Sequence, residues 1–192
     1  MKMELYSDAY YISRIKEGDA ECFGCLLDRY SRRIFALIVR IVENREDAEE
    51  ITQDVFLKVF KTLASFKAEC SFSTWIYRIA WNTAVSETRR KKDNFLPLEE
   101  NLTSDDAPES SLFSDDDDAE KHHRQLELLD KALTQLPADE RAMILLFYKD
   151  EKTIEELAII TGLTEANVKV KLFRIRKRLS VLIRNMEEKD NE

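Results

Sequence analysis

The chain has 192 residues, of which 44% are hydrophobic and 35% charged, and its formal net charge is −8. This length suits one large domain or two small ones. The longest apolar run, "IFALIVRIV" at 34–42, is interrupted by Arg40 and is too short to cross a bilayer. No secretion-signal pattern opens the chain, so we expect a cytoplasmic protein without stable membrane insertion.

The residues before position 93 predict long helices. Hydrophobic residues repeat every three or four positions from Phe23 to Ile41, which indicates one buried helical stripe. A second helix is expected from about Asn44-Arg45, with acidic residues in its first turn. Its expected buried positions are Ile51, Val55, Val59 and Leu63. The "CxxC" pair Cys22 and Cys25 falls inside the first stripe and has no second pair at ligand spacing, so we interpret both cysteines as packing residues.

A third helix is predicted over "FSTWIYRIAWNTAVSETRRKK", which ends in four consecutive cations. Cations at the C-terminal end of a helix interact favourably with its dipole, and they are equally suited to contact phosphate. Both interpretations stay open. We expect Trp75 to belong to the core, because it shares a helix face with Ile79.

An acidic segment follows, "DNFLPLEENLTSDDAPESSLFSDDDDAEK", at residues 93–121. It contains eleven acidic residues and one lysine, a charge of −10; the other 29 Lys and Arg and 27 Asp and Glu leave +2 for the rest of the chain. Two prolines and the absence of helical periodicity indicate a flexible linker. Its 29 residues can extend to about 95 Å.

The last 71 residues, 122–192, predict a helix-turn-helix domain. Pro137 is expected at the first position of a helix. Thr153 and Glu156 have the spacing of a capping box, so a short helix is expected from Ile154 to about Thr161. Gly162 ends that helix, and Thr164 caps the next one. The predicted fold is therefore all-α, with two small helical domains at 1–92 and 122–192.

The final helix is basic. Its apolar stripe is expected to pack on the domain through Val168, Leu172, Ile175, Leu179 and Leu182. No acidic residue occurs between Ala166 and Met186, whereas seven cations do. Such a helix after a capped turn is typical of DNA recognition; the alternative is a solvated basic helix that only improves solubility.

Four stretches together, in this order, resemble the extracytoplasmic-function sigma factors of bacterial RNA polymerase. They are "FGCLLDRYSRRIFALIVRIV", "REDAEEITQDVFLKVFKTLASF", "FSTWIYRIAWNTAVSETRR" and "LPADERAMILLFYKDEKTIEELAIITGLTEANVKVKLFRIRKRL". The resemblance covers nearly the whole chain apart from the linker. It implies a subunit that directs promoter-specific initiation without being an enzyme, and that needs no cofactor and no metal.

The resemblance also implies site residues. The second helix would dock on core RNA polymerase through one face, made of Asp47, Glu50, Gln53, Asp54 and Lys58. The minus-ten promoter element would be bound by the stretch "SFKAECSFSTW" and the helix after it, through Phe72, Asn82, Arg89 and Arg90. In that element, Asn82 would pair with an extruded base and the aromatics Phe72, Trp75, Tyr77 and Trp81 would stack on unpaired bases.

The minus-thirty-five element would be bound by the helix-turn-helix. The implied DNA contacts are Thr164, Glu165, Asn167, Lys169, Val170, Lys171, Phe173, Arg174 and Lys177. Val170 stands where serine-like residues are usual, and "KAEC" replaces a more common Arg-Gly-acid sequence, so no promoter consensus is transferred. The implied partners are core RNA polymerase, promoter DNA and an anti-sigma factor.

Two other functions are open on the sequence. One is a stand-alone helix-turn-helix repressor or activator, which would bind duplex DNA without polymerase. The other is a metal-dependent phosphotransfer enzyme that uses "SDDDD" at 114–118, although consecutive acids in a flexible segment lack a scaffold.

Overall fold

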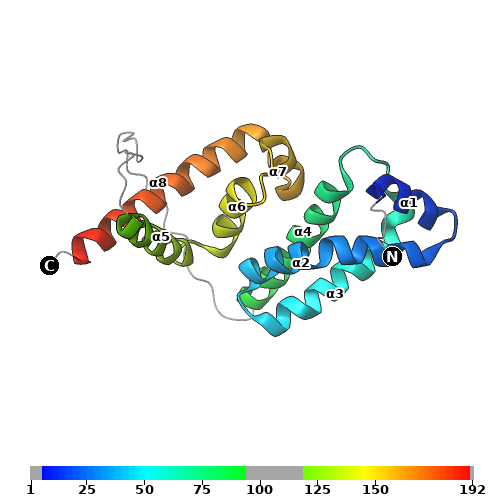
Figure 1. The fold of residues 1–192 in the computed structure, drawn as a ribbon, viewed down its shortest axis with the longest axis horizontal. Coiled ribbons are helices and arrows are strands. Elements are labelled where there is room, and N and C mark those ends of the chain that lie inside the picture. The colour runs from blue at the N-terminus through cyan, green and yellow to red at the C-terminus, as the bar shows by residue number, and fades with distance from the viewer. Residues whose placement is uncertain (1–5, 94–118, 191–192) are drawn as a thin grey trace.

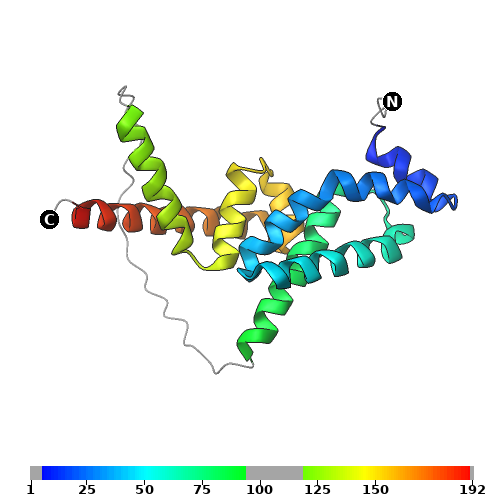
Figure 2. The same cartoon turned by 60° about the horizontal axis from the view of Figure 1, so that its bottom comes forward.

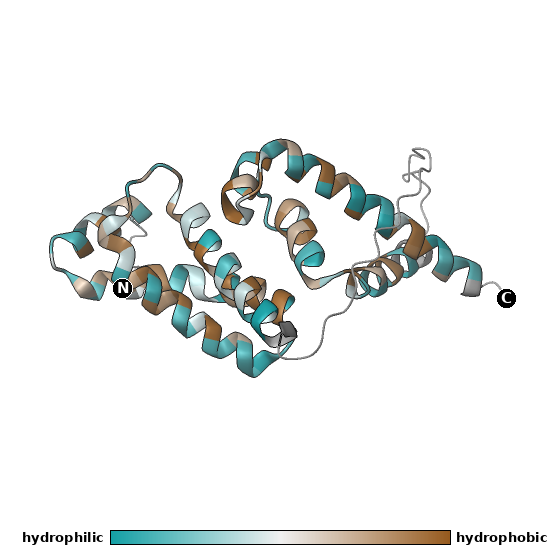
Figure 3. Ribbon diagram, turned by 180° about the vertical axis from the view of Figure 1, so that it is seen from behind, coloured by the Kyte–Doolittle hydropathy of each residue, from teal (hydrophilic) through white to brown (hydrophobic). Residues whose placement is uncertain are grey.

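The computed structural model describes residues 6–93 and 119–190. Every regular element in these two ranges is a helix (Figures 1 and 2). Hydrophilic and hydrophobic residues alternate in bands along the helices (Figure 3), as expected when each helix buries one stripe. None of the described helices is long and apolar enough to span a membrane.

The first domain is built around α2 (Phe23–Val42), which packs against both α3 (Arg45–Thr62) and α4 (Phe72–Asp93). Asn44 caps α3: its side-chain oxygen accepts from the Asp47 amide at 3.1 Å. The expected stripe of α2 is buried at most of its positions, but Leu27 is 39% exposed. All four buried positions predicted for α3 and the turn after it are confirmed.

Three shorter elements complete this domain. Helix α1 (Asp8–Lys16) packs on α2 through Tyr11 and Ile12, and 3-10 turns lie at Ala20–Cys22 and Leu63–Ser65. Helix α1 was not predicted from the sequence. Cys22 and Cys25 are half-buried free thiols in and beside α2.

The second domain contains α5 (Ala119–Thr134), α6 (Ala138–Tyr148), α7 (Ile154–Thr161) and α8 (Glu165–Asp190). The capping box of α7 is formed in both directions, at 3.1 Å each way between Thr153 and Glu156. Gly162 ends α7 at φ 74, a left-handed conformation that glycine adopts without strain. The expectation for Pro137 is corrected by one position, because Pro137 is the N-cap and α6 begins at Ala138.

The two domains pack directly against each other. Helix α7 lies against α4, and α6 lies against α2. As a result, the buried side chains of both domains form one continuous hydrophobic cluster. The predicted linker, 93–121, lies mostly outside the described residues; α4 continues through Asp93 and α5 begins at Ala119.

Candidate nucleic-acid and polymerase interfaces

The N-terminal half of α8 presents an exposed polar and basic face. The Asn167 amide donates to the Thr164 hydroxyl at 3.2 Å, so Thr164 caps α8 as expected. Val168, Leu172 and Ile175 are buried and fix the opposite face against the domain. The exposed side therefore carries most of the predicted DNA contacts: Thr164, Glu165, Asn167, Lys169, Val170, Phe173 and Arg174.

This face contains two exposed hydrophobic side chains, Val170 at 49% and Phe173 at 51%. Apolar side chains at such positions in a recognition helix contact the methyl group of thymine. Lys169 and Arg174 are exposed on the same side, and the described part of the chain shows no ion pair for either. The face thus combines cations for phosphates with groups suited to base edges.

The cations on the flank of α8 are held by the first turn of α6. Lys171 Nζ lies 2.8 Å from Asp139 Oδ2, and Arg178 Nη1 lies 2.7 Å from Glu140 Oε2. Lys171 is one of the predicted DNA contacts, so binding phosphate would require it to leave or share this carboxylate. Lys177 is half-exposed.

The loop before α4 contains a strained residue. Ala68 has φ 59, a left-handed conformation that costs a residue with a Cβ about 1–2 kcal/mol. Ala68 occupies the position where the resemblance places a glycine. Strained backbone of this kind persists where the surroundings dictate it, which is common at binding sites. Lys67, Ala68 and Glu69 are all exposed.

The aromatic residues of α4 differ from the expectation. Phe72, Tyr77 and Trp81 are buried, at 4%, 2% and 6% exposure, because α4 is enclosed by α2, α3 and α7. The ring of Phe72 packs against those of Tyr30, Phe66 and Trp75, with centroids 5.4–5.9 Å apart. Trp75 is half-buried in the same cluster, as predicted for a core residue. In this conformation, these rings support the loop, and no face of Phe72 is available for a base to stack on.

The remaining predicted minus-ten contacts are accessible. Asn82 is exposed on α4, about three turns beyond the loop. Arg89 and Arg90 are exposed near the end of the same helix, and Arg90 pairs with Glu87 at 3.0 Å. Loop 66–71 therefore comes just before α4, and Asn82 and then these arginines follow along the helix.

The predicted docking residues share one face of α3. Glu50, Gln53, Asp54 and Lys58 are exposed, Asp47 is half-exposed, and the buried side of the helix is formed by Ala48, Ile51, Val55 and Val59. At 100° per residue, the five predicted positions fall within an arc of about 140°. Leu57 lies in the middle of this arc and is 52% exposed.

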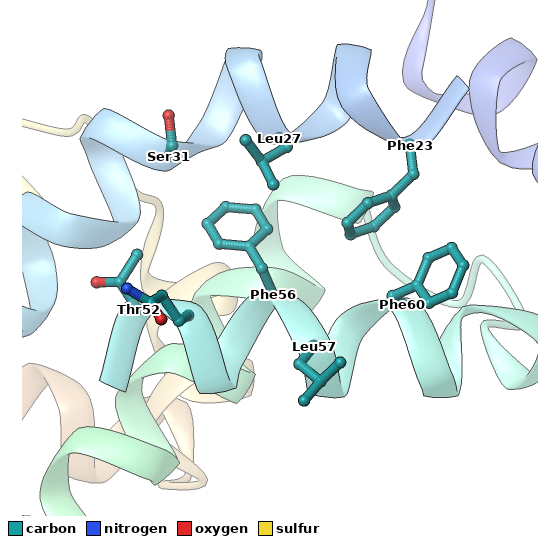
Figure 4. A pocket seen from close by; sticks show the side chains of 8 residues that line it. Phe23, Leu27, Ser31, Thr52, Phe56, Leu57 and Phe60 are labelled. Carbon is teal, nitrogen blue, oxygen red and sulfur yellow. The ribbon is translucent and has the colours of Figure 1, made fainter. Parts of the chain in front are cut away.

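An apolar groove adjoins that face. It runs between α2 and α3 and is lined by Phe23, Leu27, Ser31, Thr52, Gln53, Phe56, Leu57 and Phe60. Phe56 lies beneath Leu27, and Leu57 points away from α2 (Figure 4). Gln53 and Leu57 belong to both the groove and the docking arc, so the two surfaces are continuous.

Comparison with known proteins identifies both domains. The family model "Sigma-70 region 2" matches residues 26–93, and "Sigma-70, region 4" matches residues 126–179. The ECF RNA polymerase sigma factor SigW of Bacillus subtilis is 31% identical over 179 residues, which cover 91% of this chain and 96% of SigW. The chain belongs to the ECF sigma factors of RNA polymerase. This sigma factor thus directs transcription initiation.

Other relatives agree with this assignment. The RNA polymerase sigma-H factor of Pseudomonas aeruginosa is 29% identical to this sigma factor over 182 residues, with 88% of this chain and 90% of the relative covered. Among solved structures, the sigma factor RpoE of Bartonella quintana, in its complex with the anti-sigma factor NepR, matches with a TM-score of 0.61 at 23% identity. That match covers 84% of this chain and 96% of RpoE, and it supports the all-α fold.

Sequence reasoning missed several surface residues of this sigma factor. Leu57 and Phe60 are apolar and therefore suggest core positions, but they are 52% and 43% exposed. Leu57 points away from α2, and Phe60 packs against the ring of Phe23 in the groove (Figure 4). Their angular positions on a helical wheel, away from the buried stripe of α3, could have predicted this exposure. The polar contacts between the domains were missed as well, because no periodic pattern marks them.

Proposed function

We propose that this sigma factor binds the minus-thirty-five element through the exposed face of α8. The observation that carries the proposal is the capped helix-turn-helix whose second helix presents Asn167, Lys169 and Arg174 to solvent while its apolar stripe is buried. A helix held in this way enters the major groove with its N-terminal residues at the base edges. The neighbouring contacts are Thr164, Glu165, Val170, Lys171, Phe173 and Lys177.

The first domain would bind the minus-ten element. Loop 66–71 would hold an extruded base, Asn82 would pair with its edge, and Arg89 and Arg90 would contact the upstream backbone. Supporting this are the exposure of all three side chains and the strained backbone at Ala68. Capture of a flipped base offsets part of the free energy needed to unpair it. Phe72 would not contact the extruded base itself. Its buried ring would support the loop by packing against Tyr30 and Phe66.

The docking arc of α3 would bind core RNA polymerase. Asp47, Glu50, Gln53, Asp54 and Lys58 supply polar contacts, and the exposed Leu57 supplies an apolar one at their centre. Interfaces of this kind have a buried apolar centre within a polar rim. The sigma factor would therefore contribute binding surface in the cytoplasm, where transcription takes place, and the polymerase would carry out the bond chemistry.

An anti-sigma factor is a further proposed partner. Support comes from the RpoE–NepR complex, whose sigma factor shares the fold of this chain. We also propose the domain division 1–92, 93–121 and 122–192, in which the acidic segment lets the two DNA-binding domains occupy separate promoter elements.

Run-off transcription with the cognate core polymerase tests the proposal. The wild type is compared with Asp54→Lys and Arg174→Ala on a candidate promoter. We expect the wild type to give promoter-specific transcripts and both variants to lose most of them, the first through core binding and the second through DNA binding. Duplex binding by the wild type alone, without any gain in transcription, would instead indicate a stand-alone repressor or activator.

A further inference from the structure

Loop 66–71, which is proposed to hold an extruded base, depends on its two ends for its conformation. Its second end is fixed by Ser71, whose hydroxyl accepts from the Thr74 amide at 3.0 Å and so caps α4. Residues 67–70 make no backbone hydrogen bond to any other described residue, and one of them, Ala68, has the strained φ of 59. Backbone of this kind keeps its conformation where the segments on either side dictate it.

The first end of the loop is held by a different part of the chain. Lys16, the last residue of α1, donates from Nζ to the backbone carbonyl of Phe66 at 2.8 Å, across 50 positions of sequence. The ring of Phe66 packs against Trp75 with centroids 5.0 Å apart, so α4 holds its side chain while α1 holds its carbonyl. Helix α1 also lies against the 3-10 turn Leu63–Ser65, which leads into the loop.

Helix α1 is anchored at its other end as well. Its first residue, Asp8, accepts from the guanidinium group of Arg29 and from the hydroxyl of Tyr30, both on α2. The ring of Tyr30 packs in turn against Phe72, the first residue of α4, with centroids 5.4 Å apart. Helix α1 therefore connects the core of the first domain, at Asp8, to the start of the loop, at Lys16.

A lysine in the last turn of a helix has a simpler interpretation, in which its charge interacts with the helix dipole. That interaction stabilises the helix itself and requires no partner in another element. Here the ammonium group of Lys16 donates to a carbonyl outside α1, and this carbonyl belongs to the first residue of loop 66–71. The hydrogen bond is charge-assisted, which makes it stronger than one between neutral groups.

We infer that Lys16 is a positioning residue for the minus-ten element, because its hydrogen bond to the Phe66 carbonyl fixes the start of loop 66–71. This inference deepens the proposed function and rests on it. Lys16 itself would not touch DNA. Without its hydrogen bond the carbonyl can turn away from α1, the loop samples more conformations, and fewer molecules hold the one that fits a base.

Replacement of Lys16 in holoenzyme, assembled from core polymerase and the full chain, tests the inference. The probe is a fluorescent non-template strand that carries the minus-ten element, together with a series in which one base at a time is replaced by an abasic site. The position where the abasic site weakens wild-type binding most is the captured base. Fluorescence anisotropy gives the Kd for each strand. The ratio of the Kd without that base to the Kd with it reports base capture.

We expect the loss of the captured base to weaken binding by the wild type about tenfold. In Lys16→Met, which keeps a long side chain but cannot donate, the same ratio falls to about threefold or less. Lys16→Arg restores the wild-type ratio, because a guanidinium group can donate to the same carbonyl. The matched control is Lys61→Met, which removes an exposed lysine from the last turn of α3 and should keep the wild-type ratio.

Amide hydrogen exchange of the free chain measures the loop without DNA. The Phe66 amide donates to the carbonyl of Leu63 at 3.1 Å, so its exchange rate reports how firmly the start of the loop is held. Lys16 is exposed, and we therefore expect Lys16→Met to fold like the wild type. In that variant the Phe66 amide should exchange about threefold to tenfold faster than in the wild type or in Lys61→Met.

Two outcomes would overturn the inference. One is an unchanged exchange rate of the Phe66 amide in Lys16→Met, which would show that the hydrogen bond does not hold the loop. The other is an unchanged ratio, even with weaker binding of every strand, because Lys16 would then act as a general cation. Absence of any abasic penalty in the wild type, with exchange of Phe66 still faster in Lys16→Met, would instead count against the proposed base capture.

Discussion

Ala68 shows what a single substitution does to the loop proposed to hold a base. Its φ of 59 places a Cβ in left-handed backbone, where glycine fits without that penalty. Ala68→Gly removes the strain but adds chain entropy to the unfolded state, so we expect a net gain of about 0.5–1 kcal/mol in the free energy of unfolding. Denaturant unfolding measures it. A loss of stability would show that the left-handed conformation is not strained.

Glu156 gives a second prediction at this scale. Burial opposes its charge, but hydrogen bonds from Lys152, the Thr153 amide and Thr74 outweigh it and hold the pKa of this carboxyl below its usual value of 4.5. Because the pKa is lowered in the folded state, the stabilisation is fully present above pH 4.5 and is lost as pH falls through the lowered pKa. We expect Glu156→Gln to flatten this part of the profile of stability against pH, measured by thermal unfolding. Glu155→Gln, at an exposed neighbour, is the control and should leave the profile unchanged.

At the scale of the element, α3 combines a buried stripe with a docking arc whose centre is apolar. Leu57→Asp replaces a 52% exposed side chain, so we expect little change in stability and a loss of core polymerase binding of tenfold or more. Fluorescence anisotropy with labelled sigma factor measures the binding. Tyr10→Asp on α1, 43% exposed, is the matched control. Equal binding by the Leu57 variant would remove Leu57 from the interface.

The elements themselves were largely predictable. Periodicity located α2 and α3, and local capping chemistry located α7 and the start of α8, because a capping box and a left-handed glycine act within a few residues. Helix α1 was missed because "DAYYISRIK" is a short stretch that mixes charges with tyrosines. The burial of Phe72 was not predicted for a different reason: an aromatic residue beside a loop suits stacking on a base and packing in the core equally, and only its neighbours in space distinguish the two.

At the scale of the whole molecule, the contact between the domains could not be predicted. Its residues are polar and lie up to 110 positions apart, as for Arg40 and Asp150, so neither periodicity nor local motifs indicate that they meet. The sequence did indicate a charge division, with the acidic segment carrying −10 and the remainder +2. We expect the negative charge of the acidic segment to weaken non-specific binding of the free protein to DNA.

Replacing Asp115, Asp116, Asp117 and Asp118 by Asn tests that point. These residues lie outside the described ranges, and each carries one formal negative charge. The change brings the formal charge from −8 to −4, so we expect stronger non-specific binding to duplex DNA, with the difference fading as salt screens the charges. Electrophoretic mobility shift at two salt concentrations measures it. Equal binding at low salt would show that the acidic segment does not repel DNA.

The shared use of Glu156 has a consequence for how this protein can evolve. Its Oε2 belongs to the cap that starts the helix-turn-helix, and its Oε1 belongs to the contact between the domains. A substitution at Glu156 alters both at once, so a change that tunes the interdomain contact there also disturbs the start of the helix-turn-helix. The Arg40–Asp150 pair joins the domains without taking part in a helix cap. Related chains should therefore vary more freely at positions 40 and 150 than at 156, where we expect an acid to be kept.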